Sequence, residues 1–166
     1  MINRIHEPKH VVMKRKKTKT AKKRGGTKLI EKAGLAIKHE FYLEASWILS
    51  TLFERKLHKI LEKLQPPSQT RGMTFEQSIK RVKYWHLSSK YPDLAKHFKV
   101  ELIDDVRIWK NQRNDILKDM PDIHVSQARM EKLATEGVKF YKELNKAVKS
   151  FKSAVDLSEN GGERGG

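Results

Sequence analysis

The sequence contains no cysteine in its 166 residues. This absence excludes disulfide bonds, thiolate nucleophiles and cysteine-based zinc sites together, and a reducing cytoplasm is the default compartment for such a chain. No apolar run approaches the roughly 18 residues of a transmembrane helix, and the basic N-terminus lacks the apolar segment of a secretory signal. We therefore expect a cytoplasmic protein without a membrane partner.

Other familiar chemical signatures are also missing. Single His and acid neighbours such as His39-Glu40 occur often by chance, so a metal site has little support. Gly25-Gly26 and the C-terminal glycines lack the strand-to-helix setting of a phosphate-binding loop, and no GxSxG nucleophile elbow is present. The sequence thus predicts neither a metal nor another cofactor.

Acidic residues are almost absent from residues 1–28, which contain eleven Lys and Arg but only one acid, Glu7. This segment carries +10 of the formal net charge of +16. It has too little apolar surface to offset the entropy of ordering, so we expect a flexible basic arm. Its basic run can bind phosphates electrostatically, serve as a nuclear address in a eukaryote, or merely solubilise the chain. The candidate RNA-binding residues of the arm are Lys14, Arg15, Lys16, Lys17, Lys22, Lys23 and Arg24.

Apolar residues in the rest of the chain show helical periodicity. Apolar residues recur at steps of three and four, whereas no segment alternates long enough to predict a strand. The spacing predicts four main helices, at about 29–64, 74–89, 100–120 and 126–155. The first is long and stops at Pro66-Pro67, and Thr74 with Gln77 forms a predicted capping box at the start of the second.

These helices predict an all-α bundle over residues 29–155, followed by a disordered tail over 156–166. Trp47, Trp85 and Trp109 all fall at apolar positions of predicted helices, so core packing is favoured over base stacking for each of them. The excess of positive charge indicates a polyanionic partner, most often nucleic acid.

Arg113 interrupts the apolar stripe of the third predicted helix, which otherwise consists of Leu102, Val106, Trp109, Ile116 and Met120. Arginine is rarely buried unless it is paired, because burying the charge alone costs several kcal/mol. Three arrangements satisfy this constraint. A carboxylate from another helix can pair with Arg113, its stem can pack on Trp109 while the head reaches water, or its face can open onto a cleft that binds an anion.

The neighbours of Arg113 favour an anion-binding cleft. Asn114 and Lys118 share a helix face beside it, and Lys110 and Arg107 lie one and two turns back. A guanidinium, an amide and an ammonium that converge on one groove suit phosphate recognition. Arg107 and Lys110 therefore join the candidate RNA-binding residues.

Residues 35–150 resemble a HEPN domain, the all-α family that includes many prokaryotic RNases and toxins. FYLEASWILSTLFERKLHKIL is similar to the first long helix of the family, and LIDDVRIWKNQRNDILKDM is similar to its motif helix, in which an aromatic residue precedes Arg-Asn. The resemblance implies a homodimer whose inter-protomer cleft cuts RNA without a metal. It also implies a role in defence or toxin–antitoxin biology, with an antitoxin or other regulatory protein as a further partner.

The resemblance assigns Arg113 and Asn114 to the cleft. The family's motif also has a histidine four to six residues after the Arg, and this sequence has no histidine there. Lys118 occupies the nearest matching place and completes the candidate catalytic set. Lysine ordinarily has a pKa near 10.4, so only about one in 2,500 is deprotonated at pH 7, whereas a histidine near 6.5 serves readily in acid-base catalysis. His86 and His124 are the histidines that the fold could bring to the cleft instead.

Two functional hypotheses follow. In the first, a HEPN-like homodimer binds RNA in the Arg113 cleft, either as a ribonuclease of altered chemistry or as a relative without catalysis. In the second, a noncatalytic protein binds nucleic acid through the basic arm, and the helical domain is a scaffold for assembly or regulation.

Overall fold

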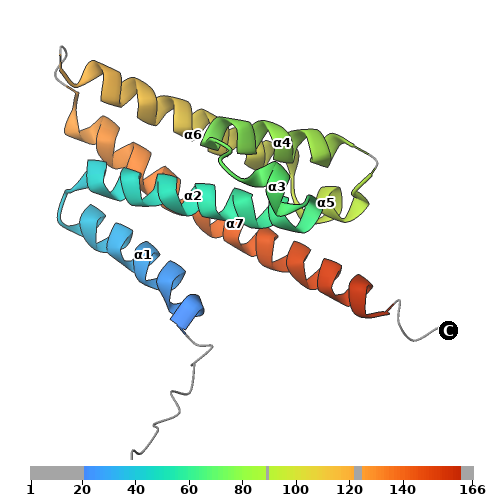
Figure 1. Cartoon of the computed structure of the whole chain (residues 1–166). Coiled ribbons are helices and arrows are strands. Elements are labelled where there is room, and N and C mark those ends of the chain that lie inside the picture. The colour runs from blue at the N-terminus through green and yellow to red at the C-terminus, as the bar shows by residue number, and fades with distance from the viewer. Residues whose placement is uncertain (1–20, 89, 122–124, 162–166) are drawn as a thin grey trace, which may run out of the picture.

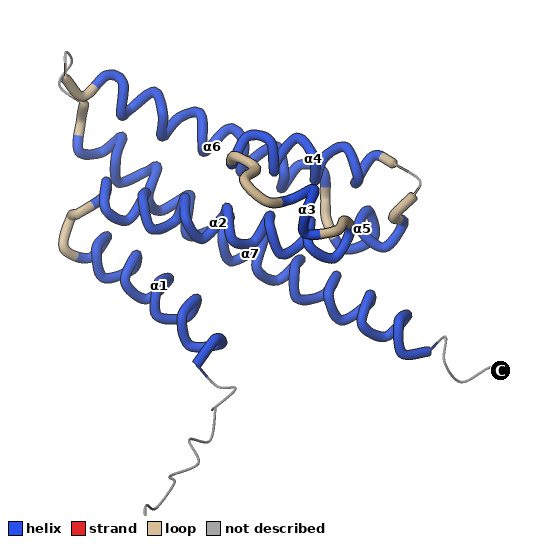
Figure 2. Tube along the Cα trace, viewed as in Figure 1, coloured by secondary structure: helices blue, strands red, loops and turns tan. Residues whose placement is uncertain are grey.

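The computed structural model of the chain describes residues 21–88, 90–121 and 125–161. All of its regular structure in these ranges is helical, as Figures 1 and 2 show, and they contain no strand. The prediction of an all-α protein is therefore confirmed. The helices are α1 (Ala21–Lys38), α2 (Tyr42–Leu64), α3 (Pro67–Thr70), α4 (Phe75–Leu87), α5 (Pro92–His97), α6 (Val100–Asp119) and α7 (Gln127–Gly161).

Two long helices, α2 and α7, form the centre of the bundle, and their mutual contact is the most extensive in the structure. Helix α1 packs on α2 from one side and α6 packs on α7 from the other, while α3, α4 and α5 gather at one end (Figure 1). Helix α4 runs beside only part of α6. The C-terminal half of α6 therefore extends beyond the cover that α4 provides (Figure 1).

Local sequence signals set several helix boundaries. The predicted capping box of α4 is present: Gln77 N–H donates to Thr74 Oγ1 over 3.2 Å, and Thr74 N–H donates to Gln77 Oε1 over 2.8 Å. Two otherwise orphaned backbone donors are satisfied in this way. Helix α2 ends at Leu64, just before the two prolines that cannot continue it.

The first predicted helix, over about 29–64, is divided in two. The chain leaves α1 after Lys38, passes through Glu40 with φ of 62°, and enters α2 at Tyr42. A positive φ costs a non-glycine residue about 1–2 kcal/mol. Packing offsets that cost, because the turn folds α1 back on α2 and brings Ala36 against Tyr42 and Ala45. No Gly or Pro marks the break, so periodicity alone predicted one helix.

The helical region also extends past both predicted limits. Helix α1 begins at Ala21, inside the segment predicted to be a flexible arm up to residue 28. Helix α7 continues to Gly161, beyond the predicted end at 155. The described part of the chain therefore contains seven helices where four main helices were expected.

Trp109 is the largest fully buried side chain and joins three helices. Its indole Nε1–H donates to the Leu133 carbonyl of α7 over 2.8 Å, and its ring lies 4.9 Å from that of Phe53 on α2. Gly137 provides the space for this contact. A Cβ at residue 137 would lie 2.7 Å from Trp109 Nε1 and 2.9 Å from Leu49 Cδ1, which is too close for real atoms.

Gly137→Ala should lower the unfolding free energy by about 1–3 kcal/mol, because the added methyl group must displace Trp109 or Leu49 in a packed core. Gly34→Ala is the matched control. Gly34 also lies in a helix, but a Cβ there meets nothing within 4 Å. The control should be stabilised by roughly 0.5–1 kcal/mol through helix propensity. Urea unfolding of both variants tests the contact, and equal stabilisation of the two would contradict it.

Candidate functional site

Arg113 lies where α6 passes the exposed side of α2, and its guanidinium covers an indole ring. The Cζ atom of Arg113 is 5.2 Å from the ring centroid of Trp47. Trp47 is 63% exposed, so one face of the pair is open to solvent. A cation held over an aromatic face in this way gains about 0.5–1 kcal/mol when exposed and more when desolvated.

Arg113 forms no ion pair with a carboxylate among the described residues. Its Nε atom is buried without a hydrogen-bond acceptor, and its Nη1 approaches only Asn114 Oδ1, at the long distance of 3.5 Å. Burial lowers the pKa of Arg113 from its ordinary value, and the charge of Glu54 on α2 partly opposes that shift. The half-buried guanidinium therefore retains hydrogen-bonding capacity that the protein does not use.

This geometry decides among the arrangements that the sequence left open. The first of these arrangements, an ion pair between Arg113 and a carboxylate, is absent from the described residues. The Arg113 head lies over Trp47, whereas Trp109 is enclosed in the core.

The prediction of a core position for Trp47 was wrong, because its side chain is largely exposed. Trp47 shares a helix face with Ser50, Thr51 and Glu54, and these polar neighbours are the sequence signal that marks a solvent-facing position.

The other candidate cations of α6 do not converge on Arg113. Lys110 Nζ lies 2.5 Å from Glu76 Oε2, and Arg107 Nε lies 3.7 Å from Glu76 Oε1. Glu76 belongs to α4, so these contacts join α4 to α6. The hydrogen bond from Lys110, with the nearby positive charges, lowers the pKa of Glu76 from its ordinary value, although burial opposes the shift. Arg107 and Lys110 thus help to hold the bundle together.

The remaining polar candidates on α6 differ in availability. Asn114 is half-buried beside Arg113, and Lys118 is exposed one turn further along. Asp119 pairs with Arg129 of α7 over 3.1 Å, so that carboxylate is already engaged. Asp115 is exposed on the helix surface.

His86 does not supply the missing imidazole. Its Nε2 lies 2.7 Å from the Phe98 carbonyl, just before the start of α6. Arg113 lies thirteen residues beyond Val100, the first residue of α6, which corresponds to about 20 Å at 1.5 Å per residue. His124 lies outside the described residues. So do Lys14, Arg15, Lys16 and Lys17, while Lys22, Lys23 and Arg24 fall in the first turn of α1.

Lys56 is a second unusual cation, on α2 against α7. Its Nζ donates to Asn145 Oδ1 and lies 5.8 Å from the centroid of the Tyr141 ring. Burial, together with repulsion from Lys59, Lys149 and Lys152, lowers the pKa of Lys56 to about 8. The contacts of Lys56 are structural, and its amine loses its proton more readily than that of an ordinary lysine.

The described residues contain no group of three or more His, Cys, Asp or Glu side chains placed to bind a metal ion. In those same ranges no helix is both long and apolar enough to cross a membrane.

Scans of the chain against protein-family models, curated proteins and solved structures found no match.

Lys56→Met should raise the melting temperature by about 2–4 °C near pH 7, because it removes a partly desolvated charge. The expected gain is modest because solvent screens a half-buried charge. The folded chain releases the Lys56 proton near pH 8, but the unfolded chain holds it until about 10.5. The parent's unfolding free energy therefore gains a favourable contribution between these pH values. The advantage of the variant should shrink over that interval.

Thermal unfolding at several pH values between 7 and 10.5 measures this difference, with exposed Lys139→Met as the control for added apolar surface. A difference between parent and Lys56→Met that stays constant from pH 8 to 10.5 would contradict the lowered pKa.

Proposed function

We propose that the chain binds single-stranded RNA through the face formed by Arg113 and Trp47. The observation that carries the proposal is the half-buried guanidinium of Arg113, which has no carboxylate partner among the described residues and a buried Nε without an acceptor. A phosphate oxygen would supply both the missing charge and the missing acceptor. The partner we propose is therefore an anion with directional acceptors.

Trp47 indicates why the anion would belong to a nucleic acid strand. Proteins that bind single strands combine cations that contact the backbone with aromatic rings on which bases stack. The Trp47 ring is exposed beside a cation that can hold a phosphate, so one nucleotide can use both groups. The general positive charge of the chain would attract the strand from a distance.

Binding without efficient cleavage is the form of this function that the chemistry supports best. Among the described residues, the imidazole of His86 is engaged far from Arg113, and Asp119 is held by Arg129. Lys118 can bind a phosphate as a cation but is a poor general base. The proposed relationship to HEPN domains thus corresponds to a member with a weakened or lost ribonuclease activity.

A homodimer and a regulatory protein partner belong to the same proposal. In the HEPN-like arrangement, two copies of the Arg113 face would line one groove, and the exposed Trp47 would lie at its edge. The basic segment 1–28 would add electrostatic affinity without specifying the site. If this segment alone binds RNA, the helical domain is instead a scaffold.

Arg113→Ala and Trp47→Ala should weaken RNA binding in different ways. Loss of Trp47 should reduce affinity for a labelled 12-nucleotide oligouridylate by about 5- to 150-fold, which corresponds to 1–3 kcal/mol for a stacked base. The dependence of this affinity on salt should stay unchanged. Loss of Arg113 should weaken binding and reduce the slope of log affinity against log salt by about 0.7, the value for one phosphate contact.

Fluorescence anisotropy at several salt concentrations measures both effects. Lys146→Ala removes the same charge from an exposed position on α7 and is the control. If Arg113→Ala behaves like Lys146→Ala while deletion of residues 1–28 eliminates binding, the Arg113 face is not the RNA site and the scaffold hypothesis holds.

Lys118→His tests whether the face lacks only an acid-base group. In EDTA the parent should cut the oligonucleotide slowly or not at all, whereas Lys118→His should cut it at least about 10-fold faster, because an imidazole titrates near neutral pH. Lys118→Gln is the matched control. If Lys118→His cuts no faster than the parent, the Arg113 face is not a HEPN-like cleavage site that lacks only its histidine.

A further inference from the structure

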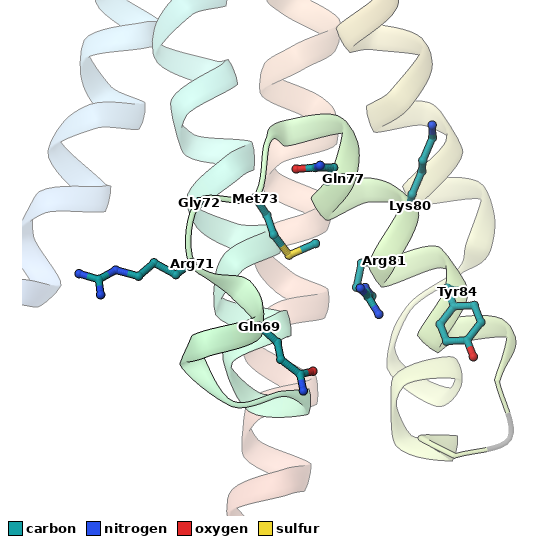
Figure 3. A pocket seen from close by; sticks show the side chains of 8 residues that line it. All are labelled: Gln69, Arg71, Gly72, Met73, Gln77, Lys80, Arg81 and Tyr84. Atoms are coloured by element: carbon teal, nitrogen blue, oxygen red, sulfur yellow. The ribbon is translucent and has the colours of Figure 1, made fainter.

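A basic hollow lies on a different face of the protein, where the turn between α3 and α4 passes the outer side of α4 (Figure 3). Its volume of about 630 Å³ falls within the range of small-molecule sites, although it is open to solvent. Arg71, Lys80 and Arg81 are among its lining residues, and no carboxylate is. The hollow therefore favours an anionic ligand.

Helical spacing places three of the α4 residues that line the hollow on one face of the helix. Gln77, Arg81 and Tyr84 follow one another at steps of four and three, so they share the outward face of α4. In Figure 3, Arg81 and Met73 extend into the space between the turn and α4, and Gln69 approaches it from α3. Lys80 and Arg71 extend away from this space and form its rim (Figure 3).

The turn that encloses the hollow depends on Gly72. Its φ of +77° lies in the left-handed region, which lets the chain reverse direction between α3 and α4. A short backbone hydrogen-bonded turn accompanies it, since Met73 N–H donates to the Thr70 carbonyl. The reversal lets Gln69 of α3 and Gln77 of α4 line the same hollow.

Arg81 is the cation best placed to bind a ligand. It is exposed and has no ion-pair partner among the described residues, and the same holds for Arg71. Lys80 is only loosely engaged, because its Nζ lies 3.7 Å from Glu76, which itself faces the cations of α6. Arg81 can therefore offer its planar guanidinium to two phosphate oxygens at once.

The uncharged lining indicates what else the ligand carries. Tyr84 is 61% exposed and lies one turn beyond Arg81, so its ring can stack on a planar group while Arg81 holds the phosphate. Gln77 uses its Oε1 to cap α4, which leaves its amide N–H groups free to donate to a carbonyl or ring acceptor. Met73 adds an adaptable apolar surface.

From these groups we infer that the hollow between the α3–α4 turn and α4 is a nucleotide site: Arg81 binds the phosphate, and Tyr84 stacks on the base. This site uses residues other than Arg113 and Trp47 and stands whether or not that face binds RNA. The same chemistry suits a free mononucleotide or one nucleotide of a strand.

Titration of the full chain with uridine 5′-monophosphate, inorganic phosphate or uridine, followed by amide NMR shifts, tests the site. We expect the monophosphate to shift the amides of Gln77 and Arg81 and to bind at least about 10-fold more tightly than either fragment. Arg81→Ala should reduce its affinity at least about 10-fold. Tyr84→Ala should remove the preference for the monophosphate over phosphate. Both residues are exposed, so the fold should survive.

Arg55→Ala, which removes an exposed arginine of α2, and Arg113→Ala are the controls, and both should leave monophosphate binding unchanged. Equal weakening by Arg55→Ala and Arg81→Ala, or equal affinity for phosphate and the monophosphate, would overturn the nucleotide site. A uridine trinucleotide distinguishes a free mononucleotide from one nucleotide of a strand as the ligand. Tighter binding that still depends on Arg81 identifies a strand, and affinity equal to that of the monophosphate identifies a free nucleotide.

Discussion

The contact between Trp109 and Gly137 is the constraint on which the rest of the structure depends. A buried indole must place its N–H on an acceptor and its ring in a matching space, and α7 provides both, through the Leu133 carbonyl and the missing side chain of Gly137. This contact fixes the position of α6 along α7 and against α2. Arg113, one turn beyond Trp109, is consequently carried out of the core at the place where α2 presents Trp47.

The extent of α4 then determines what each cation of α6 contacts. Helix α4 begins at Phe75, so its first carboxylate, Glu76, reaches Arg107 and Lys110 but not the following turn of α6. Further along α6, Arg113 lies over the Trp47 ring of α2 and forms no ion pair with a carboxylate among the described residues. The same run of basic residues therefore divides into a structural part and a part that remains available for an anion.

The Arg113 face and the hollow beside α4 share one chemical pattern, an arginine without an acid partner next to an exposed aromatic ring. Glu76 faces three cations of α4 and α6, Lys80, Arg107 and Lys110, and this one carboxylate offsets only part of their charge. If both proposals hold, the protein would contact a nucleic acid at more than one nucleotide, because each place would bind a phosphate and a planar base together. The net charge would then supply attraction, and these pairs would supply position.

The sequence by itself determined the helical class and the capping box at Thr74, and it favoured a core position for Trp109, since these depend on residues close together or on one helical stripe. Arg113 was likewise identified from its own stripe. Only the tertiary structure decided that the chain turns at Glu40, that Trp47 is exposed and that Glu76 engages Arg107 and Lys110. These outcomes depend on which helix lies across each position, and periodicity within one helix carries no information about its neighbours.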